Sequence, residues 1–195
     1  FFHFAHRRLT QDRARDPELA APKPHAFADY LWHLTGWHYW TGNLRVMLHA
    51  ALGGELPAYV PTRGASKVRG EARSFLAGYA VIGLTSVIAG STLAWDFWVL
   101  PALLGQPALR AYLMAEHGAC PLLPDMLKNT RTTFTARALA WFVWEGCYHT
   151  AHHIAPTIPF HHLEALTRHL DPNIEARAES YRAAHRQIIG SLGQP

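Results

Sequence analysis

A short histidine-rich segment late in the chain contains the residues best suited to chemistry. His149, His152 and His153 fall within five residues, and residues three or four apart share one face of a helix. Their imidazoles can therefore converge on one point, and imidazole nitrogen is a good ligand for iron, copper, zinc and nickel. His3 and His6 repeat the HxxH spacing near the other end of the chain. Together the two clusters predict a metal centre built from neutral nitrogen ligands.

The rest of the composition argues against other kinds of site. The two cysteines, Cys120 and Cys147, have no CxxC partner, so neither a disulfide framework nor a zinc ribbon is indicated. The sequence has no Ser-His-Asp pattern, no phosphate-binding glycine loop and no HExxH helix, which argues against a zinc hydrolase. The formal charge is +4, but the basic residues do not alternate with aromatic ones as in a nucleic-acid-binding module. We therefore expect no nucleic-acid partner.

The middle of the chain is apolar, and basic clusters flank it. Residues 74–94 are 21 residues without a charge, long enough to cross ~30 Å of hydrocarbon at ~1.5 Å per residue. Residues 95–98 have the composition of an interfacial turn, and 99–115 form a second, proline-interrupted apolar segment. This pattern predicts a membrane hairpin over 74–115. By the positive-inside bias, the flanking basic residues place its two ends in the cytoplasm. The alternative is a buried helical pair in a soluble protein.

The remaining segments predict helices. An aromatic stretch runs from Phe27 to about Leu52, and residues 163–190 have the spacing of one or two amphipathic helices. We therefore expect an all-α fold, with a single domain over residues 1–195. In it, an integral membrane helical hairpin would hold a cytoplasmic, histidine-rich helical cap.

Four motifs resemble one known family over nearly the whole chain. Residues 3–12 read HFAHRRLTQD, with DPEL at 16–19; residues 116–121 read EHGACP; residues 129–133 read NTRTT; and residues 148–153 read YHTAHH, followed by Pro156 and Pro159. These motifs resemble the second histidine box, the EH motif, the segment before the third box and the third box of the membrane fatty acid desaturase and hydroxylase superfamily, particularly its bacterial desaturase-like proteins.

The resemblance implies a particular metal centre. Members of that superfamily carry two iron ions on histidine ligands at the cytoplasmic membrane face. The matching ligands in this chain are His3, His6, His117, His149, His152 and His153. Four nearby residues are candidates to orient the imidazoles, namely Glu116, Glu145, Asn129 and Arg131. Asp16-Pro17-Glu18 fits a turn that holds the loop after the second box.

The chain also departs from the family pattern. The second box normally reads HxxHH, but here its last position is Arg7, and a guanidinium has no lone pair to donate to a metal. The first histidine box is missing, so we expect the chain to be incomplete at its N-terminus and the site as given to be incomplete too. His33 and His38 have HxxxxH spacing but follow the second box, and we interpret them as a chance match.

The function implied is that of an O₂-dependent di-iron lipid desaturase, which introduces a C=C bond into a fatty acyl chain. Two alternatives stay open: a di-iron hydroxylase or ketolase acting on an alkane, sterol or carotenoid, and a degenerate, non-catalytic membrane protein, which Arg7 favours. The implied partners are a lipid acyl substrate, the membrane, and an electron donor such as a ferredoxin or a cytochrome-b5-like protein. A basic rim of Arg8, Arg13, Arg15 and Lys23 could attract an acidic donor. The expected location is the bacterial inner membrane, with the histidine boxes on the cytoplasmic side.

Overall fold

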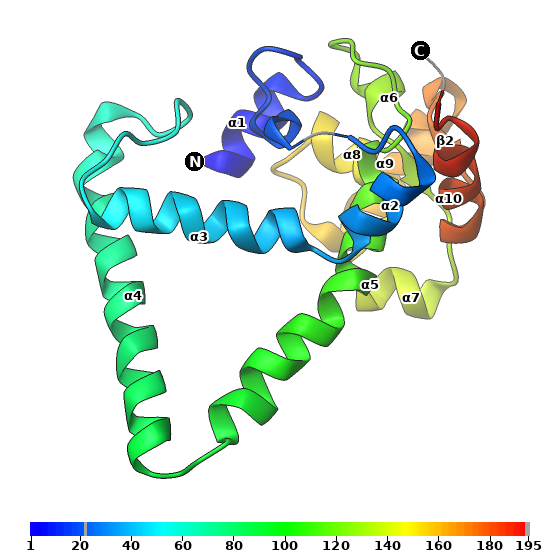
Figure 1. Ribbon diagram of the computed structural model, residues 1–195. Helices are drawn as coiled ribbons and strands as arrows, with labels where there is room; N and C mark the ends of the chain where they lie inside the picture. Colours follow the sequence, from blue (N-terminus) through cyan, green and yellow to red (C-terminus); the bar gives the residue numbers. More distant parts are fainter. Residues whose placement is uncertain (22, 194–195) are drawn as a thin grey trace. The chain divides into compact units, whose positions relative to one another are not determined.

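The computed structural model describes residues 1–21 and 23–193, and helices dominate it (Figure 1). The α-helices are α1 (Phe2–Leu9), α2 (Phe27–Leu34), α3 (Trp37–Ala51), α4 (Ala65–Ile88), α5 (Leu100–His117), α6 (Met126–Asn129), α7 (Arg137–Phe142), α8 (His149–Ile154), α9 (Leu163–Leu170) and α10 (Tyr181–Gly190). Two short strands, β1 (Thr132–Thr133) and β2 (Arg177–Ala178), pair in parallel. The prediction of an all-α class is confirmed.

Contacts within the chain group into two compact units. The first contains residues 1–2 and 32–109, and the second contains residues 3–31 and 110–195. The prediction of one domain over residues 1–195 stays a prediction.

The first unit is built on α3 and α4, which pack against each other. Gly36, at φ 72°, separates α3 from α2, and this left-handed conformation is one that glycine adopts readily. Arg73 Nε on α4 donates to the carbonyl of Ala51 at 2.8 Å, and Arg69 donates to the carbonyl of Gly54 at 3.2 Å. These two bonds fix the loop that follows α3 onto the first half of α4.

The predicted membrane hairpin is not confirmed. Among the described residues, no helix combines the length and the apolar character that crossing a bilayer requires. The uncharged run at 74–94 does not coincide with one helix, because α4 begins at Ala65 with charged turns and ends at Ile88. The chain turns at residues 89–91 and returns through α5 (Figure 1). The expected interfacial turn at 95–98 is wrong, because Trp95–Val99 is helical and leads directly into α5.

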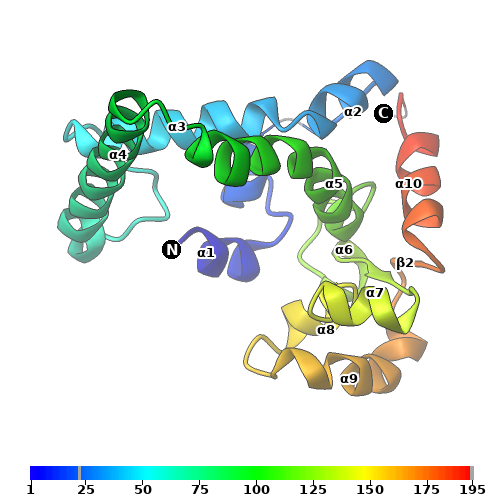
Figure 2. The same cartoon turned by 90° about the horizontal axis from the view of Figure 1, so that it is seen from below.

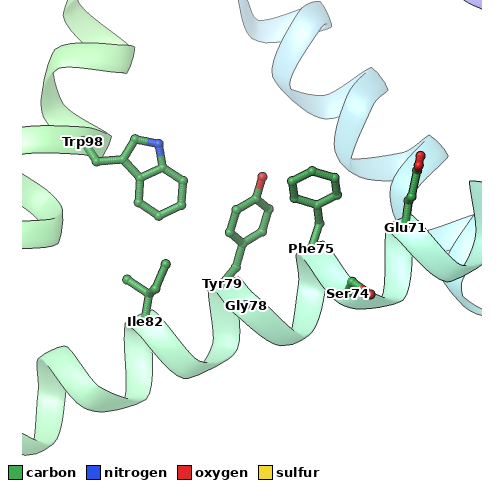
Figure 3. A pocket seen from close by; sticks show the side chains of 7 residues that line it. All are labelled: Glu71, Ser74, Phe75, Gly78, Tyr79, Ile82 and Trp98. Atoms are coloured by element: carbon green, nitrogen blue, oxygen red, sulfur yellow. The ribbon is translucent and has the colours of Figure 1, made fainter.

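An open apolar groove lies on α4. It has a volume of about 490 Å³ and is lined by Glu71, Ser74, Phe75, Gly78, Tyr79, Ile82 and Trp98. Figure 3 shows Phe75, Tyr79 and Ile82 rising from α4, with the indole of Trp98 facing them. The rings of Tyr79 and Trp98 are 5.3 Å apart, within the range of aromatic contact.

The second unit has a polar core. Thr150 donates to the carbonyl of Thr130 at 2.7 Å, and Thr132 donates to Thr150 at 3.0 Å. All three residues are fully buried. In β1 and β2, Thr132 is opposite Arg177, while α8 packs against β1, α6 and α9, as Figure 2 shows for α8 and α9. This network fixes α8, the helix that carries the histidine-rich segment, inside the second unit.

Candidate metal centre

Four buried histidines from three helices converge in the second unit. His6 lies on α1, His117 is the last residue of α5, and His149 and His153 lie one turn apart on α8. The Nε2 atom of His117 is 3.2 Å from Nε2 of His6 and 3.2 Å from Nε2 of His149. Nε2 of His149 is in turn 3.1 Å from Nε2 of His153. The same ring nitrogen of each histidine therefore points to a common place.

The opposite ring nitrogens bind groups around the cluster. Nδ1 of His6 donates to Oδ1 of Asp16 at 2.9 Å, and Nδ1 of His117 donates to the backbone carbonyl of Asn129 at 3.0 Å. Nδ1 of His153 lies 3.0 Å from Oγ1 of Thr10, whose hydroxyl donates to the carbonyl of His6. Because a carbonyl and a hydroxyl already engaged as a donor can only accept, His117 and His153 carry their protons on Nδ1. Their Nε2 lone pairs face the cluster.

His149 has a carboxyl partner of a different kind. Its Nδ1 is 3.4 Å from Oε1 of Glu116, and burial raises the pKa of that carboxyl group well above its usual range. Glu116 is also linked to Arg131 through the backbone, since the N–H of Arg131 donates to the carbonyl of Glu116 at 2.8 Å. The carboxyl group thus lies at the edge of the cluster, next to an imidazole.

Burial keeps most of these imidazoles neutral. Desolvation lowers the pKa of His117 to about 3, and it lowers the pKa of His149 well below the usual value. Desolvation and the neighbouring histidines also lower the pKa of His153. His6 differs, because although burial opposes it, the bond to Asp16 and the charge of Glu18 raise its pKa. Neutral imidazole is the form that binds a metal ion.

The donor set fits a transition-metal ion. Two nitrogens bound to one ion at about 2.1 Å are about 3.0–3.4 Å apart when their bonds meet at angles between octahedral and tetrahedral values. The separations of 3.1 and 3.2 Å in the cluster lie in this range. Lone pairs that face one another without a proton repel, and a cation between them removes that repulsion. His6, His117 and His153 also form a group whose donor atoms all lie within 4.8 Å of one another.

His3 and His152 lie at the edge of this cluster. Their rings are stacked with centroids 5.7 Å apart, and the ring of His152 is 5.6 Å from that of His149. Burial and the charge of Arg7 lower the pKa of His152 to about 4. The six predicted ligands thus divide into four buried histidines with converging nitrogens and an outer pair.

Arg7 lies beside the outer pair of histidines. Its guanidinium donates to the carbonyl of His152 at 3.3 Å, while its Nε is buried without a hydrogen-bond partner among the described residues. Burial lowers the pKa of His3 and of His152, and the positive charge of Arg7 lowers both further. A fixed cation at this point opposes the binding of a second cation to the outer pair.

The four residues expected to orient the imidazoles differ in whether they contact a histidine. Glu116 and the backbone of Asn129 contact histidines, as described above. The side chain of Asn129 donates to the carbonyl of Thr10, and Arg131 donates to the carbonyl of Ala115. Both side chains therefore hold backbone segments that lie next to the cluster. Glu145 instead accepts from the N–H of Glu164 at 3.3 Å and makes no described contact with a histidine of the cluster.

Sequence analysis indicated no role for Thr10 and suggested only a turn that holds the loop for Asp16 and Glu18. Thr10 orients His153 across 143 residues of sequence, and nothing in its local pattern indicates this. Glu18 approaches His6 directly, with Oε2 3.1 Å from Nε2. Asp16 was expected only to shape a turn, and it does cap the helical turn Pro17–Ala20, but it also binds His6. The DPEL spacing after the second histidine cluster was the signal that could have located both acids.

The fold and the site together define a helical protein with a buried histidine cluster suited to a transition metal. The family model for fatty acid desaturases matches residues 2–185, and this chain belongs to that family. Membership suggests an oxidoreductase of lipid metabolism, in a family whose members are di-iron proteins and are typically associated with membranes. No curated protein and no solved structure gives a significant match to the chain.

Proposed function

We propose that this protein is an O₂-dependent di-iron desaturase that introduces a C=C bond into a fatty acyl chain. The observation that carries the proposal is the convergence of four buried Nε2 atoms within 3.1–3.2 Å of their neighbours. Membership of the fatty acid desaturase family supplies the reaction class. The proposed ligands are His3, His6, His117, His149, His152 and His153.

The bound iron would supply O₂ activation with two external electrons, so that two hydrogens leave adjacent carbons and both oxygen atoms leave as water. The chain's own residues prepare the site for this chemistry. Asp16, Asn129 and Thr10 hold the imidazoles of His6, His117 and His153 in one tautomer and one orientation. The carboxyl group of Glu116 lies beside Nδ1 of His149, at 3.4 Å.

We further propose a membrane location with the cluster on the cytoplasmic side and an acidic electron donor. The apolar surface of the first unit supports the membrane location, since residues such as Val87 and Phe97 are 79% exposed. Of the proposed basic rim, Arg8, Arg13 and Arg15 are exposed, but Arg15 pairs with Asp12, and Lys23 donates to Gln11. Arg8 and Arg13 are therefore the residues to reverse in charge when donor-coupled turnover and its salt dependence are measured.

Iron analysis of the membrane-purified protein, expressed from its complete reading frame, tests the proposal. About two irons per chain are expected, with most of them lost in His149→Ala and retained in His161→Ala. His161 is an exposed histidine outside the cluster, so it controls for the general loss of an imidazole. Equal iron in all three proteins, or none in the unchanged protein, contradicts the proposal.

Lipid analysis then distinguishes the reactions. Fatty acids from cells that express the protein should gain a double bond, and this gain should vanish with His149→Ala. A hydroxylated or ketonic product in its place would establish the alternative oxygenase. Arg7 specifically favours a non-catalytic protein, because its charge lies beside the outer histidine pair. The absence of both iron and product would make that alternative the better account.

A further inference from the structure

A carboxylate that no family motif marks as a ligand faces the histidine cluster. Oε2 of Glu18 is 3.1 Å from Nε2 of His6 and 3.9 Å from Nε2 of His117. The two nitrogens are themselves 3.2 Å apart. Three donor atoms, from α1, from the helical turn Pro17–Ala20 and from the end of α5, thus form a compact triangle.

This oxygen has no other partner. The Glu18 side chain as a whole is 39% exposed, yet Oε2 is buried and accepts no hydrogen bond from the residues that the structure describes. A buried carboxylate oxygen without a hydrogen bond is costly, and desolvation raises the pKa of Glu18 accordingly. Either a proton on His6 or a metal ion at the same place would remove that cost.

The neighbouring acid, Asp16, has a different role. Its Oδ1 accepts from Nδ1 of His6 and from the N–H of Glu18, and its Oδ2 accepts from the N–H of Gln11. Both oxygens of Asp16 are therefore occupied in holding the loop and orienting an imidazole from its outer side. Glu18 approaches the same imidazole from the inner side, where the lone pair of Nε2 lies.

Two basic side chains, Lys23 and Arg110, act on Glu18 through their charge. Lys23 donates to Oε1 of Gln11 at 2.6 Å, and it affects Glu18 only through its charge. The close contacts of Oε2 of Glu18 with ring nitrogens are those with His6 and His117 given above.

We propose that Glu18 is a metal ligand, so that the ion between His6 and His117 has mixed histidine and carboxylate coordination. The inference rests on the proposed metal centre. A carboxylate brings the negative charge that a purely imidazole set lacks, and this charge offsets the nearby guanidinium of Arg7. Carboxylate oxygen and imidazole nitrogen together are a common ligand set for iron.

The test compares iron binding in the unchanged protein, Glu18→Gln and Asp12→Asn, each purified from its complete reading frame. Glu18→Gln keeps the shape of the side chain and removes its charge. It should lower iron affinity by more than ~10-fold, the lower end of what loss of an outer partner costs. Asp12 lies in the same loop, but it pairs with Arg15 and not with a histidine. Asp12→Asn should therefore leave iron binding unchanged.

Mössbauer spectra of iron-57 protein distinguish a ligand from a residue that only positions His6. Loss of a carboxylate ligand should change the isomer shift and quadrupole splitting of one iron in Glu18→Gln. Formate added to Glu18→Ala should restore the original spectrum, whereas formate added to His6→Ala should not. Iron retained by Glu18→Gln with an unchanged spectrum would overturn the inference while leaving the metal centre intact. Absence of iron from the unchanged protein would overturn both.

Discussion

The two units of the chain differ in where their polar and apolar side chains lie. The first unit, residues 1–2 and 32–109, leaves large apolar groups at the surface, including Leu84, Val87, Ile88, Phe97 and Leu104. The second unit, residues 3–31 and 110–195, buries polar ones, including histidines, threonines, Asn129 and Arg131. Exposed apolar patches mark surfaces that contact a membrane or a partner, and buried polar groups need partners of their own. The exposed apolar residues of the first unit therefore offer a surface for a membrane or a partner, and the histidine cluster of the second offers a site for a cation.

Removing a converging imidazole should have the largest effect. His117→Ala deletes the nitrogen that lies 3.2 Å from both His6 and His149, so iron content should fall to a small fraction of the original. Metal analysis of the purified variant measures this, with His162→Ala as the control, since His162 is exposed. Iron retained by His117→Ala would remove the basis for treating the second unit as a cation site.

A charge on the apolar surface of the first unit should have the next largest effect. Val87→Lys places a cation at a residue that is 79% exposed near the end of α4, and it should weaken membrane association by up to about 3 kcal/mol if that residue contacts hydrocarbon. The fraction of protein in the membrane pellet measures this. Ile189→Lys, on α10 of the second unit, is the matched control. Equal partitioning of the two variants would show that the contrast between the units has no bearing on the membrane.

Loss of the outer partner of His6 should weaken metal binding less than loss of a ligand. Asp16→Asn removes the charge that accepts from Nδ1 of His6 and should reduce iron affinity about 10- to 100-fold. Competition with a chelator gives the affinity. Asp29→Asn provides a control, because Asp29 caps α2 and contacts no histidine side chain of the cluster. An unchanged iron affinity in Asp16→Asn would mean that packing alone orients His6.

Removal of the nearby cation should strengthen metal binding. Arg7→Gln eliminates the guanidinium whose charge lowers the pKa of His3 and His152, so iron affinity should rise by up to about tenfold. Arg8→Gln removes an exposed charge next to it in sequence, where solvent screens it, and should have little effect. Iron titration of both variants gives the comparison, and an equal response would show that Arg7 acts only through net charge.

The smallest effect is expected far from the cluster. Ser180→Ala removes the side chain that accepts from the N–H of Ala183 at the start of α10, and it should lower the free energy of unfolding by about 1 kcal/mol. Denaturant unfolding measures this loss, while iron content should stay unchanged. Loss of iron in this variant would indicate that the cluster depends on the stability of the whole second unit.

The sequence was most informative where chemistry depends on neighbours along one helix. The spacing of His149 and His153 places both on one face of α8, because four residues are close to one helical turn. Within residues 163–190 the predicted helices are confirmed as α9 and α10, but a short helical turn and strand β2 lie between them. The apolar run at 74–94 was less informative. Hydropathy shows where charges are absent but not where a helix starts and stops, and α4 begins and ends about six to nine residues earlier than that run.

The sequence by itself determined the family, the helical class and the residue types able to bind a metal. Only the tertiary structure decided which of them meet. His6 and His117 are 111 residues apart, and Thr10 and His153 are 143 residues apart. Local preferences cannot specify such contacts, because they depend on how α1, α5 and α8 pack together. The structure also decides that Asp16 and Glu18, two acids in one turn, contact different nitrogens of a single imidazole.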